Sequence, residues 1–337
     1  MLIPHPFPWT LAQWQQLRQR VSEDRLPHAM LFCGIEGLGK LEIARQFAQS
    51  ILCEQPDGNG EPCQVCRSCS QFISKSHPDF YLLEPEEEGK AVKVDQIRGL
   101  IGHFNLASHY GRYRVAIISP ADSMNLAAAN SLLKSLEEPP ENTLIILVSS
   151  HSAALPSTIL SRCQRVNFDA PGTDMAVNWL NNHQDDFPDS DIAGKERELL
   201  AMAYGAPLKA VTSADSEQIA LRNEIFEHFM AVAEGTETAL SGNTQWLKTG
   251  ITTPIQWVYS WISDLIKLKN HLNAAITNHD KSTDLQKLAQ KVELEGLYRY
   301  LDTVLDTLKK QRAPLNAQMI MDDLLLDWKA MITINQR

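Results

Sequence analysis

The stretch "FCGIEGLGKLEIA", Phe32 to Ala44, decides the fold of the first half of the chain. An apolar, β-favouring run from Ala29 to Cys33 leads into three glycines and a lysine, and a helix-favouring run follows them. Strand, glycine-rich loop and helix in this order predict a phosphate-binding loop, in which backbone N–H groups and the helix N-terminus cradle phosphates. The residue after the lysine is Leu41, where such a loop places a Ser or Thr hydroxyl on the Mg²⁺ ion of the nucleotide. The sequence therefore predicts the shape of a nucleotide site without its usual metal ligand.

A second set of groups that hydrolysis requires is also missing. A hydrolysing phosphate-loop enzyme holds Mg²⁺ with an acidic residue at the end of a neighbouring strand and commonly uses another to orient the attacking water. Where this acidic pair would lie, directly after the apolar run from Val115 to Ile118, the chain has Ser119 and Pro120. We therefore expect no intrinsic ATP hydrolysis. Binding of ATP or ADP stays open, because the residues that shape the loop are intact: Gly34, Gly37, Gly39 and Lys40.

Strand-like and helix-like segments alternate from about residue 10 to residue 166, an order that favours a parallel sheet flanked by helices. Beyond Phe168 the strand signals fade and helical patterns remain. We predict an α/β phosphate-loop domain over residues 1–168, a small helical domain over 169–210 and an all-helical domain over 211–337. The predicted strands are Ala29–Cys33, Phe80–Leu83, Arg114–Ser119, Leu144–Ser149 and Arg165–Phe168.

Composition and charge limit the classes of function. The chain has 337 residues, of which 44% are apolar, enough for two or three domains with ordinary cores. No apolar run approaches the roughly 20 residues that span a bilayer, and the N-terminal residues lack the pattern of a secretory signal. We therefore expect a soluble, cytoplasmic protein with no membrane partner. The net charge of −10 argues against tight autonomous binding to nucleic acid, because affinity for phosphate backbones comes mainly from Lys and Arg.

Four of the six cysteines lie in one stretch with the spacing C-x9-C-x2-C-x2-C: Cys53, Cys63, Cys66 and Cys69. In a reducing cytosol this spacing favours thiolate ligands over disulfides. Four thiolates close a tetrahedral Zn²⁺ site with no open position for catalysis. We therefore predict a structural zinc module at about residues 53–69, inserted after the loop helix. Reduced, unligated cysteines or a redox pair are the alternatives.

The stretch "NSLLKSLEEPPENTLIILVSSHSAALPSTILSRC", Asn130 to Cys163, resembles the core of the bacterial clamp loader ATPase module of the AAA+ superfamily. Together with the inserted cysteines, it resembles the clamp loader subunits of DNA polymerase III. The resemblance implies an AAA+ base, a small helical lid and an all-α collar, in the order of the three predicted domains. The chain departs from the hydrolysing members at Leu41, Ser119 and Pro120, and again at Leu208, where their sensor 2 motif places an arginine. These departures match a member of the family that does not hydrolyse ATP.

The same resemblance implies a role for Arg162 in the motif "SRC", Ser161 to Cys163. In the family this arginine is an arginine finger, donated across a subunit interface to the ATP of the neighbouring motor. A guanidinium places fixed positive charge and planar donors where negative charge spreads over phosphoryl oxygens, an effect worth about 10³ to 10⁵ in rate. The alternative is a solvated or structural arginine at a helix end. Ser149 and Ser150 fall in the family's sensor 1 region, where a polar side chain reads the γ-phosphate.

The resemblance further implies partners: the gamma/tau ATPase subunits and the delta subunit of the clamp loader, the beta sliding clamp, and primer-template DNA within the complex. The chain would then be a non-hydrolysing subunit of a DNA-directed DNA polymerase holoenzyme, in the nucleoid-associated replisome. Two other functions stay open. The first is an active ATPase with unconventional metal ligands such as Asp122 or Glu137, which turnover by the isolated chain would favour. The second is a zinc-dependent nucleic-acid-binding module, which salt-sensitive DNA binding by the isolated chain would favour.

Overall fold

The computed structural model divides the chain into two compact units, Met1–Pro171 and Gly172–Arg337. Among the described residues, no helix is both long enough and apolar enough to cross a membrane. The residues that the structure describes are 6–58, 60–87, 90–104, 113–187, 190, 192–214, 216–240, 246–247, 250–271, 276–310 and 316–334.

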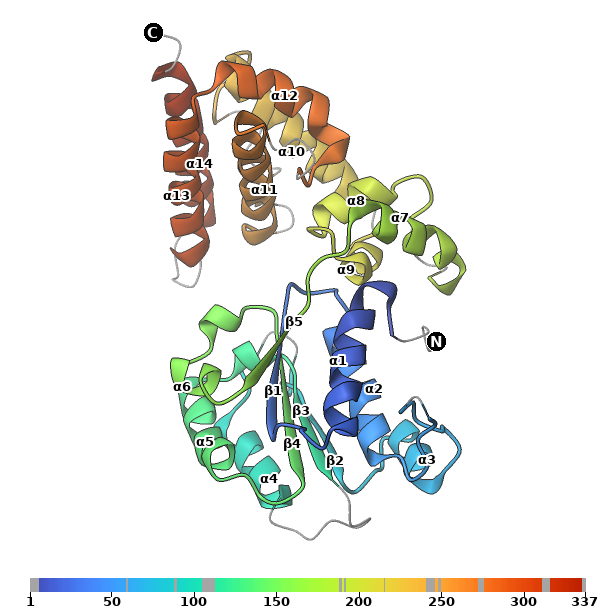
Figure 1. The fold of residues 1–337 in the computed structure, drawn as a ribbon. Helices are drawn as coiled ribbons and strands as arrows, with labels where there is room; N and C mark the ends of the chain where they lie inside the picture. The colour runs from blue at the N-terminus through green and yellow to red at the C-terminus, as the bar shows by residue number, and fades with distance from the viewer. Residues whose placement is uncertain are drawn as a thin grey trace. The chain divides into compact units, whose positions relative to one another are not determined.

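The first unit is built on a five-stranded parallel sheet (Figure 1). The strand order is β2-β3-β4-β1-β5, so the strand that precedes the phosphate loop lies between two others. The five predicted strands are confirmed, with ends that differ by at most one residue. The third strand stops at Ile118 rather than Ser119 because Pro120 has no N–H to continue the ladder. The strands are β1 (Ala29–Cys33), β2 (Phe80–Leu83), β3 (Arg114–Ile118), β4 (Thr143–Ser149) and β5 (Gln164–Asn167).

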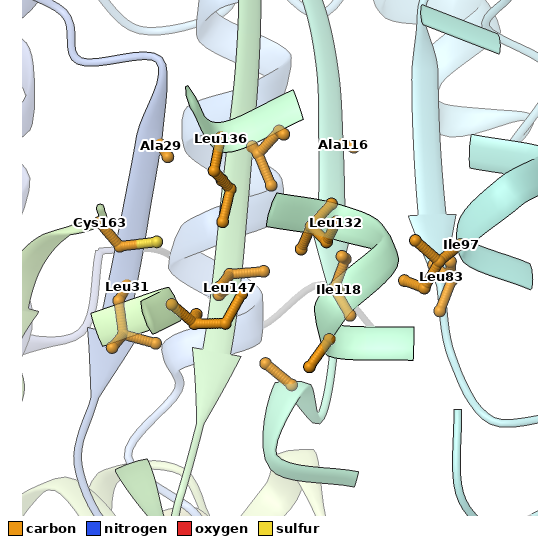
Figure 2. Close-up of a cluster of buried hydrophobic side chains, with 14 of the residues drawn as sticks. Ala29, Leu31, Leu83, Ile97, Ala116, Ile118, Leu132, Leu136, Leu147 and Cys163 are labelled. Atoms are coloured by element: carbon orange, nitrogen blue, oxygen red, sulfur yellow. The ribbon is translucent and has the colours of Figure 1, made fainter. Parts of the chain in front are cut away.

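Helices cover both faces of this sheet (Figure 1). On one face, α4 and α5 enclose an apolar core, in which Leu132 of α5 packs with Leu147 of β4 and Ile118 of β3 (Figure 2). Helices α1 and α2 lie on the other face. Burial on both faces is why the three central strands, β3, β4 and β1, are nearly continuous apolar runs in the sequence. The helices are α1 (Leu11–Ser22), α2 (Lys40–Leu52), α3 (Arg67–Ile73), α4 (Val94–Phe104), α5 (Leu126–Glu137) and α6 (Ser157–Leu160).

The second unit is helical throughout its described residues, as predicted for the chain beyond Phe168. Trp328 of α14 stacks on Phe229 of α10 with ring centroids 4.2 Å apart, which ties the last long helix to the first. The predicted boundary at residue 210 falls inside α9, so a continuous helix crosses it. The helices are α7 (Thr173–Asn182), α8 (Glu196–Met202), α9 (Pro207–Thr212), α10 (Ser216–Glu234), α11 (Thr252–Lys269), α12 (Ser282–Lys291), α13 (Leu294–Lys310) and α14 (Ala317–Ile334).

A buried polar network joins α8, α10 and α11 to the short 3₁₀ turn η7 (His279–Lys281). Arg222 of α10 is fully buried and donates to Asp280 and to Asn278 Oδ1, each at 2.7 Å. Glu198 of α8 lies 3.7 Å from the same guanidinium. Asp264 of α11, also fully buried, accepts hydrogen bonds from the backbone and side-chain nitrogens of Asn278, both at 2.7 Å. Each buried charge therefore has hydrogen-bonded partners, which offset the cost of removing it from water.

Candidate functional site

The predicted phosphate loop connects β1 to the N-terminus of α2. Gly37 and Gly39 have φ angles of 82° and 80°, in the left-handed region that glycine adopts without strain. At Gly34 the constraint is space, because a Cβ atom there would lie 2.3 Å from the carbonyl oxygen of Phe168. The three glycines are therefore required by the backbone, and the loop keeps the shape that its sequence predicts.

An aromatic pair from the N-terminal segment packs against this loop. A Cβ atom on Gly39 would lie 2.2 Å from Cε2 of Phe7, so the phenyl ring lies directly against the glycine. Phe7 is fully buried and stacks on Trp9 with centroids 5.0 Å apart. The indole N–H of Trp9 donates to the Leu38 carbonyl at 3.0 Å. The aromatic pair therefore supports the loop on residues that the sequence pattern did not single out.

Lys40 is the first residue of α2 and is 5% exposed. Its ammonium donates to the Ile35 carbonyl at 2.5 Å and to the Ser150 hydroxyl at 3.2 Å. Burial lowers the pKa of Lys40 to about 8, although the carboxylates of Glu36 and Asp122 act in the opposite direction. The lysine of the loop is thus held by protein oxygens and binds its proton less tightly than an exposed lysine.

The residues that depart from hydrolysing phosphate loops lie on α2 and at the end of β3. Leu41 is half-buried as the second residue of α2. Ser119 is buried directly after β3, and Pro120 follows at the surface. Mg²⁺ takes oxygen ligands in near-octahedral geometry. Of these three side chains, Ser119 alone carries an oxygen, so together they offer the metal one neutral ligand in place of a hydroxyl and a carboxylate.

Asp122, the alternative metal ligand named from the sequence, has a structural role. Its carboxylate accepts the backbone N–H of Ser150 at 3.1 Å and lies 3.4 Å from Nδ1 of His151. Burial opposes ionisation of Asp122, but hydrogen bonds from the Ser149 hydroxyl and the Ser150 N–H outweigh it and hold the pKa of the carboxyl below its ordinary value. Asp122 therefore joins the segment after β3 to the end of β4 as a carboxylate.

The sensor-region residues fall in both units. Ser149 ends β4, and its hydroxyl accepts the backbone N–H of His151 at 3.2 Å. Ser150 follows and contacts the Lys40 ammonium. Leu208, where the resemblance would place a sensor 2 arginine, is half-buried in α9 of the second unit. Within the first unit, Ser150 is therefore the serine that contacts the loop lysine, while Ser149 bonds to His151.

The four predicted metal-binding cysteines converge. The sulfur atoms of Cys53, Cys63, Cys66 and Cys69 all lie within 4.8 Å of one another, and this group could hold a metal ion. Backbone N–H groups point at the sulfurs, as in the bond from Cys66 N to Cys63 Sγ at 3.3 Å. Such bonds from Val65 and Cys66 lower the pKa of Cys63 to about 7, which favours the thiolate that a metal needs.

The turn between the first two of these cysteines is anchored to the helices of the first unit. Glu61 accepts the indole N–H of Trp14 on α1 at 2.7 Å and the side-chain amide of Gln46 on α2 at 3.0 Å. Trp14 is 2% exposed, and a buried indole N–H needs a hydrogen-bond acceptor within the protein. Glu61 supplies that acceptor. The cysteine module is therefore fixed to the phosphate-loop helix by polar contacts as well as by the chain.

Arg162 lies in the turn between α6 and β5, on a backbone held by the core. Its neighbours Ile159 and Cys163 are buried in the cluster that Figure 2 shows, while 33% of the Arg162 side chain is exposed. The guanidinium donates to the Thr158 carbonyl at 2.9 Å and to the Glu137 carboxylate at 2.5 Å. The structure therefore gives Arg162 a rigid base and a partly exposed head.

Comparison with known proteins settles the family. A family model described as "DNA polymerase III, delta subunit" matches residues 10–172, and one described as "DNA polymerase III, delta subunit, C terminal" matches residues 216–330. The chain is 30% identical over 328 residues to DNA polymerase III subunit delta' of Pseudomonas aeruginosa, across 96% of this chain and 98% of that protein. The chain belongs to the DNA polymerase III delta-prime family.

Two further relatives differ in how much of this chain they match. DNA polymerase III subunit delta' of Escherichia coli is 26% identical over 327 residues, across 95% of this chain and 94% of that protein. DNA polymerase III subunit tau of the same organism is 32% identical over 206 residues, but this covers 60% of this chain and 31% of that protein. Membership of the delta-prime family confirms the predicted resemblance to the clamp loader subunits of DNA polymerase III.

Several contacts of this delta-prime chain were not predicted from the sequence. Phe7 packs against Gly39 and Glu137 pairs with Arg162, while Glu61 anchors the turn between Cys53 and Cys63. Only Glu137 carries a sequence signal of its own, because an acidic residue in the last turn of a helix lies at the negative end of the helix dipole and needs a nearby cation.

Proposed function

We propose that this delta-prime chain is a non-hydrolysing subunit of the clamp loader, which helps to load the ring-shaped sliding clamp onto primed DNA. It supplies Arg162 as an arginine finger to the ATP held by a neighbouring motor subunit. One observation carries the proposal: the loop keeps its phosphate-binding shape while Leu41, Ser119 and Pro120 deprive it of the groups that hold magnesium. The chain therefore contributes to the hydrolysis of a nucleotide that another chain binds.

The geometry around Arg162 supports this role. An arginine finger acts by bringing a fixed positive charge to the phosphoryl group in the transition state, so its backbone must be rigid and its head must reach outward. Arg162 meets both conditions, with Ile159 and Cys163 buried on either side of a partly exposed guanidinium. The gamma/tau ATPase subunits are the partners that would hold the nucleotide, with the delta subunit, the beta clamp and primer-template DNA in the same assembly.

The cysteine module fits a structural Zn²⁺ ion. Zinc–sulfur bonds of about 2.3 Å in a tetrahedron separate the sulfurs by about 3.8 Å, and Cys53 and Cys66 have their sulfurs 4.0 Å apart. Four protein ligands leave no open coordination position, so the ion would stabilise the module and take no part in catalysis. Glu61 would transmit this order to α1 and α2 through Trp14 and Gln46.

Replacement of the finger tests the proposed function. In a clamp loader reconstituted with hydrolysing partner subunits, we expect Arg162→Ala to slow hydrolysis at the adjoining site by about 10³ to 10⁵, with assembly and the melting temperature of the chain unchanged. Arg162→Lys keeps the charge without the planar fork and should restore part of the rate. Arg25→Ala is the matched control, since Arg25 is an exposed arginine paired with Glu23 at 3.4 Å. Wild-type hydrolysis by the complex with Arg162→Ala would refute the finger.

A further inference from the structure

We propose that Glu137 is the positioning residue of Arg162: its carboxylate fixes the guanidinium so that one edge stays directed outward for the phosphoryl group of the neighbouring ATP. This inference rests on the proposed function of Arg162 and deepens it. The two side chains come from different elements, because Glu137 is the last residue of α5 and Arg162 follows α6. Their contact, from Nη2 to Oε1, is 2.5 Å long.

The guanidinium is held on two of its three nitrogens. Nη1 donates to the Thr158 carbonyl at 2.9 Å and lies 3.3 Å from the Ser161 hydroxyl, while Nη2 donates to Glu137. An arginine has five N–H donors in a fixed planar fork. Within the part of the chain that the structure describes, the Nε–H and the second N–H of Nη2 have no acceptor. Nε and Nη2 lie along one edge of the planar fork, so this edge keeps donors for a phosphoryl group, which arginine commonly binds bidentately.

The position of Glu137 in its helix indicates a specific use. It lies in the last turn of α5, where the partial negative charge of the helix end disfavours a carboxylate. Its side chain is 50% exposed, so solvent screens the ion pair and the pair contributes little to the stability of the fold. An acidic residue that is unfavourable for its helix and adds little stability is explained by what it does to Arg162.

The physical gain is conformational entropy. A free arginine side chain samples many rotamers and must lose that freedom when it docks on a phosphate. Contacts with Glu137 and the Thr158 carbonyl restrict this freedom before the neighbour arrives, and they leave other donors of the fork available. Prior orientation of a catalytic group lowers the barrier of the step in which it acts. Glu137 is therefore expected to affect the hydrolysis step and not the binding of ATP by the neighbour.

The test uses the reconstituted clamp loader and measures kcat and KM for ATP hydrolysis. We expect Glu137→Ala to lower kcat by about 3- to 10-fold with KM unchanged, since a misdirected finger loses part but not all of its effect. Glu137→Gln keeps an oxygen that can accept from Nη2 and should retain most of the rate. Glu138→Ala is the matched control, because Glu138 is the adjacent exposed carboxylate and has no described contact with Arg162.

A double-mutant cycle of Glu137 and Arg162 separates a positioning role of Glu137 from any other role of this residue. In an Arg162→Ala background, Glu137→Ala should have no additional effect on kcat, since there is no guanidinium left to orient. If Arg162→Ala slows hydrolysis but Glu137→Ala leaves it unchanged or faster, the positioning role is overturned and the finger stands. An equal loss from Glu137→Ala with and without Arg162 also overturns it. If Arg162→Ala itself has no effect, the finger fails, and the positioning role fails with it.

Discussion

Lys40 shows how a single residue can keep its place in a motif while its environment changes its chemistry. In a nucleotide site this lysine meets phosphate oxygens. Here its ammonium is bonded to the Ile35 carbonyl and the Ser150 hydroxyl of the same chain. A buried ammonium is costly even with two neutral acceptors, because neither supplies a full negative charge. Lys40 is therefore a residue at which the fold retains a functional group at some cost in stability.

This cost predicts a pH-dependent difference in stability between the wild type and Lys40→Met. The ammonium of Lys40 titrates near pH 8 in the folded chain and near its ordinary value of 10.5 when unfolded. Between these values the unfolded state binds more protons, so the stability of the wild type rises with pH. Lys40→Met should be the more stable protein near pH 7, and its advantage should shrink from pH 8 to 10.5.

Chemical unfolding of both proteins across this pH range measures the effect. Lys134→Met, at an exposed position on α5, is the control for loss of a lysine charge without burial. A constant difference between Lys40→Met and the wild type from pH 7 to 10.5 would contradict the account of Lys40.

At the scale of elements, the proposed metal would add to the packing that holds the cysteine module. The chain between Cys53 and Cys63 is polar and rich in turns, with Glu61 as its described anchor to α1 and α2. Helix α3 is short, and Cys66 is its N-cap: Cys66 Sγ accepts the backbone N–H of Cys69. Elements this small gain little stability from packing alone, so the free energy of binding the proposed metal would also be folding free energy.

Removal of zinc should therefore lower the melting temperature of the wild-type chain and speed hydrogen exchange across residues 53–73. The Cys66→Ser/Cys69→Ser variant should melt lower than the wild type and show no response to zinc or to a chelator, because half of the ligands are gone. Thermal unfolding with and without zinc, together with exchange mass spectrometry, gives both readouts. Equal melting temperatures of zinc-loaded and zinc-free wild type would count against a structural metal.

The elements themselves were largely predictable, whereas their side-chain contacts were not. Strands β1 to β4 are mainly apolar runs bounded by glycine, proline or polar residues, so their identity follows from local pattern. The ends shift because they depend on pairing: β4 begins at Thr143, which lies opposite Arg114 of β3. The pairs Glu61–Trp14 and Glu137–Arg162 join segments far apart in the chain, and no periodicity encodes such contacts.

At the scale of the molecule, the charged network around Arg222 holds helices of the second unit together, in addition to apolar packing. The network connects α8, within the predicted lid, to α10 and α11, within the predicted collar. The sequence shows an arginine, a glutamate and aspartates in helical segments, which are usually solvated surface charges. Full burial of Arg222 and Asp264 was therefore beyond what composition and pattern can predict.

Removing one member of this network should destabilise the second unit. Arg222→Ala leaves Asp280 and Asn278 without their shared donor, and breaking a buried pair in this way costs about 3 to 5 kcal/mol. Arg299→Ala is the control, because Arg299 and Glu295 form an exposed pair at 4.0 Å and its loss should change stability by less than about 0.5 kcal/mol. Chemical denaturation followed by circular dichroism compares the two variants, and equal, small losses would show that the network contributes no more than a surface pair.

The central place of β1 has a consequence for how the protein is made. Ala29 pairs with Ile145 on one side and Met30 with Gln164 on the other, so both partners of β1 leave the ribosome long after it does. All five residues of β1 are buried in the finished sheet. During synthesis β1 and the loop that follows it are made before β4 and β5, the strands that pair with β1. Folding therefore depends on contacts between distant segments, which makes it slow. The nascent chain therefore exposes this apolar segment until β4 and β5 have been made, an interval in which such segments are prone to aggregate.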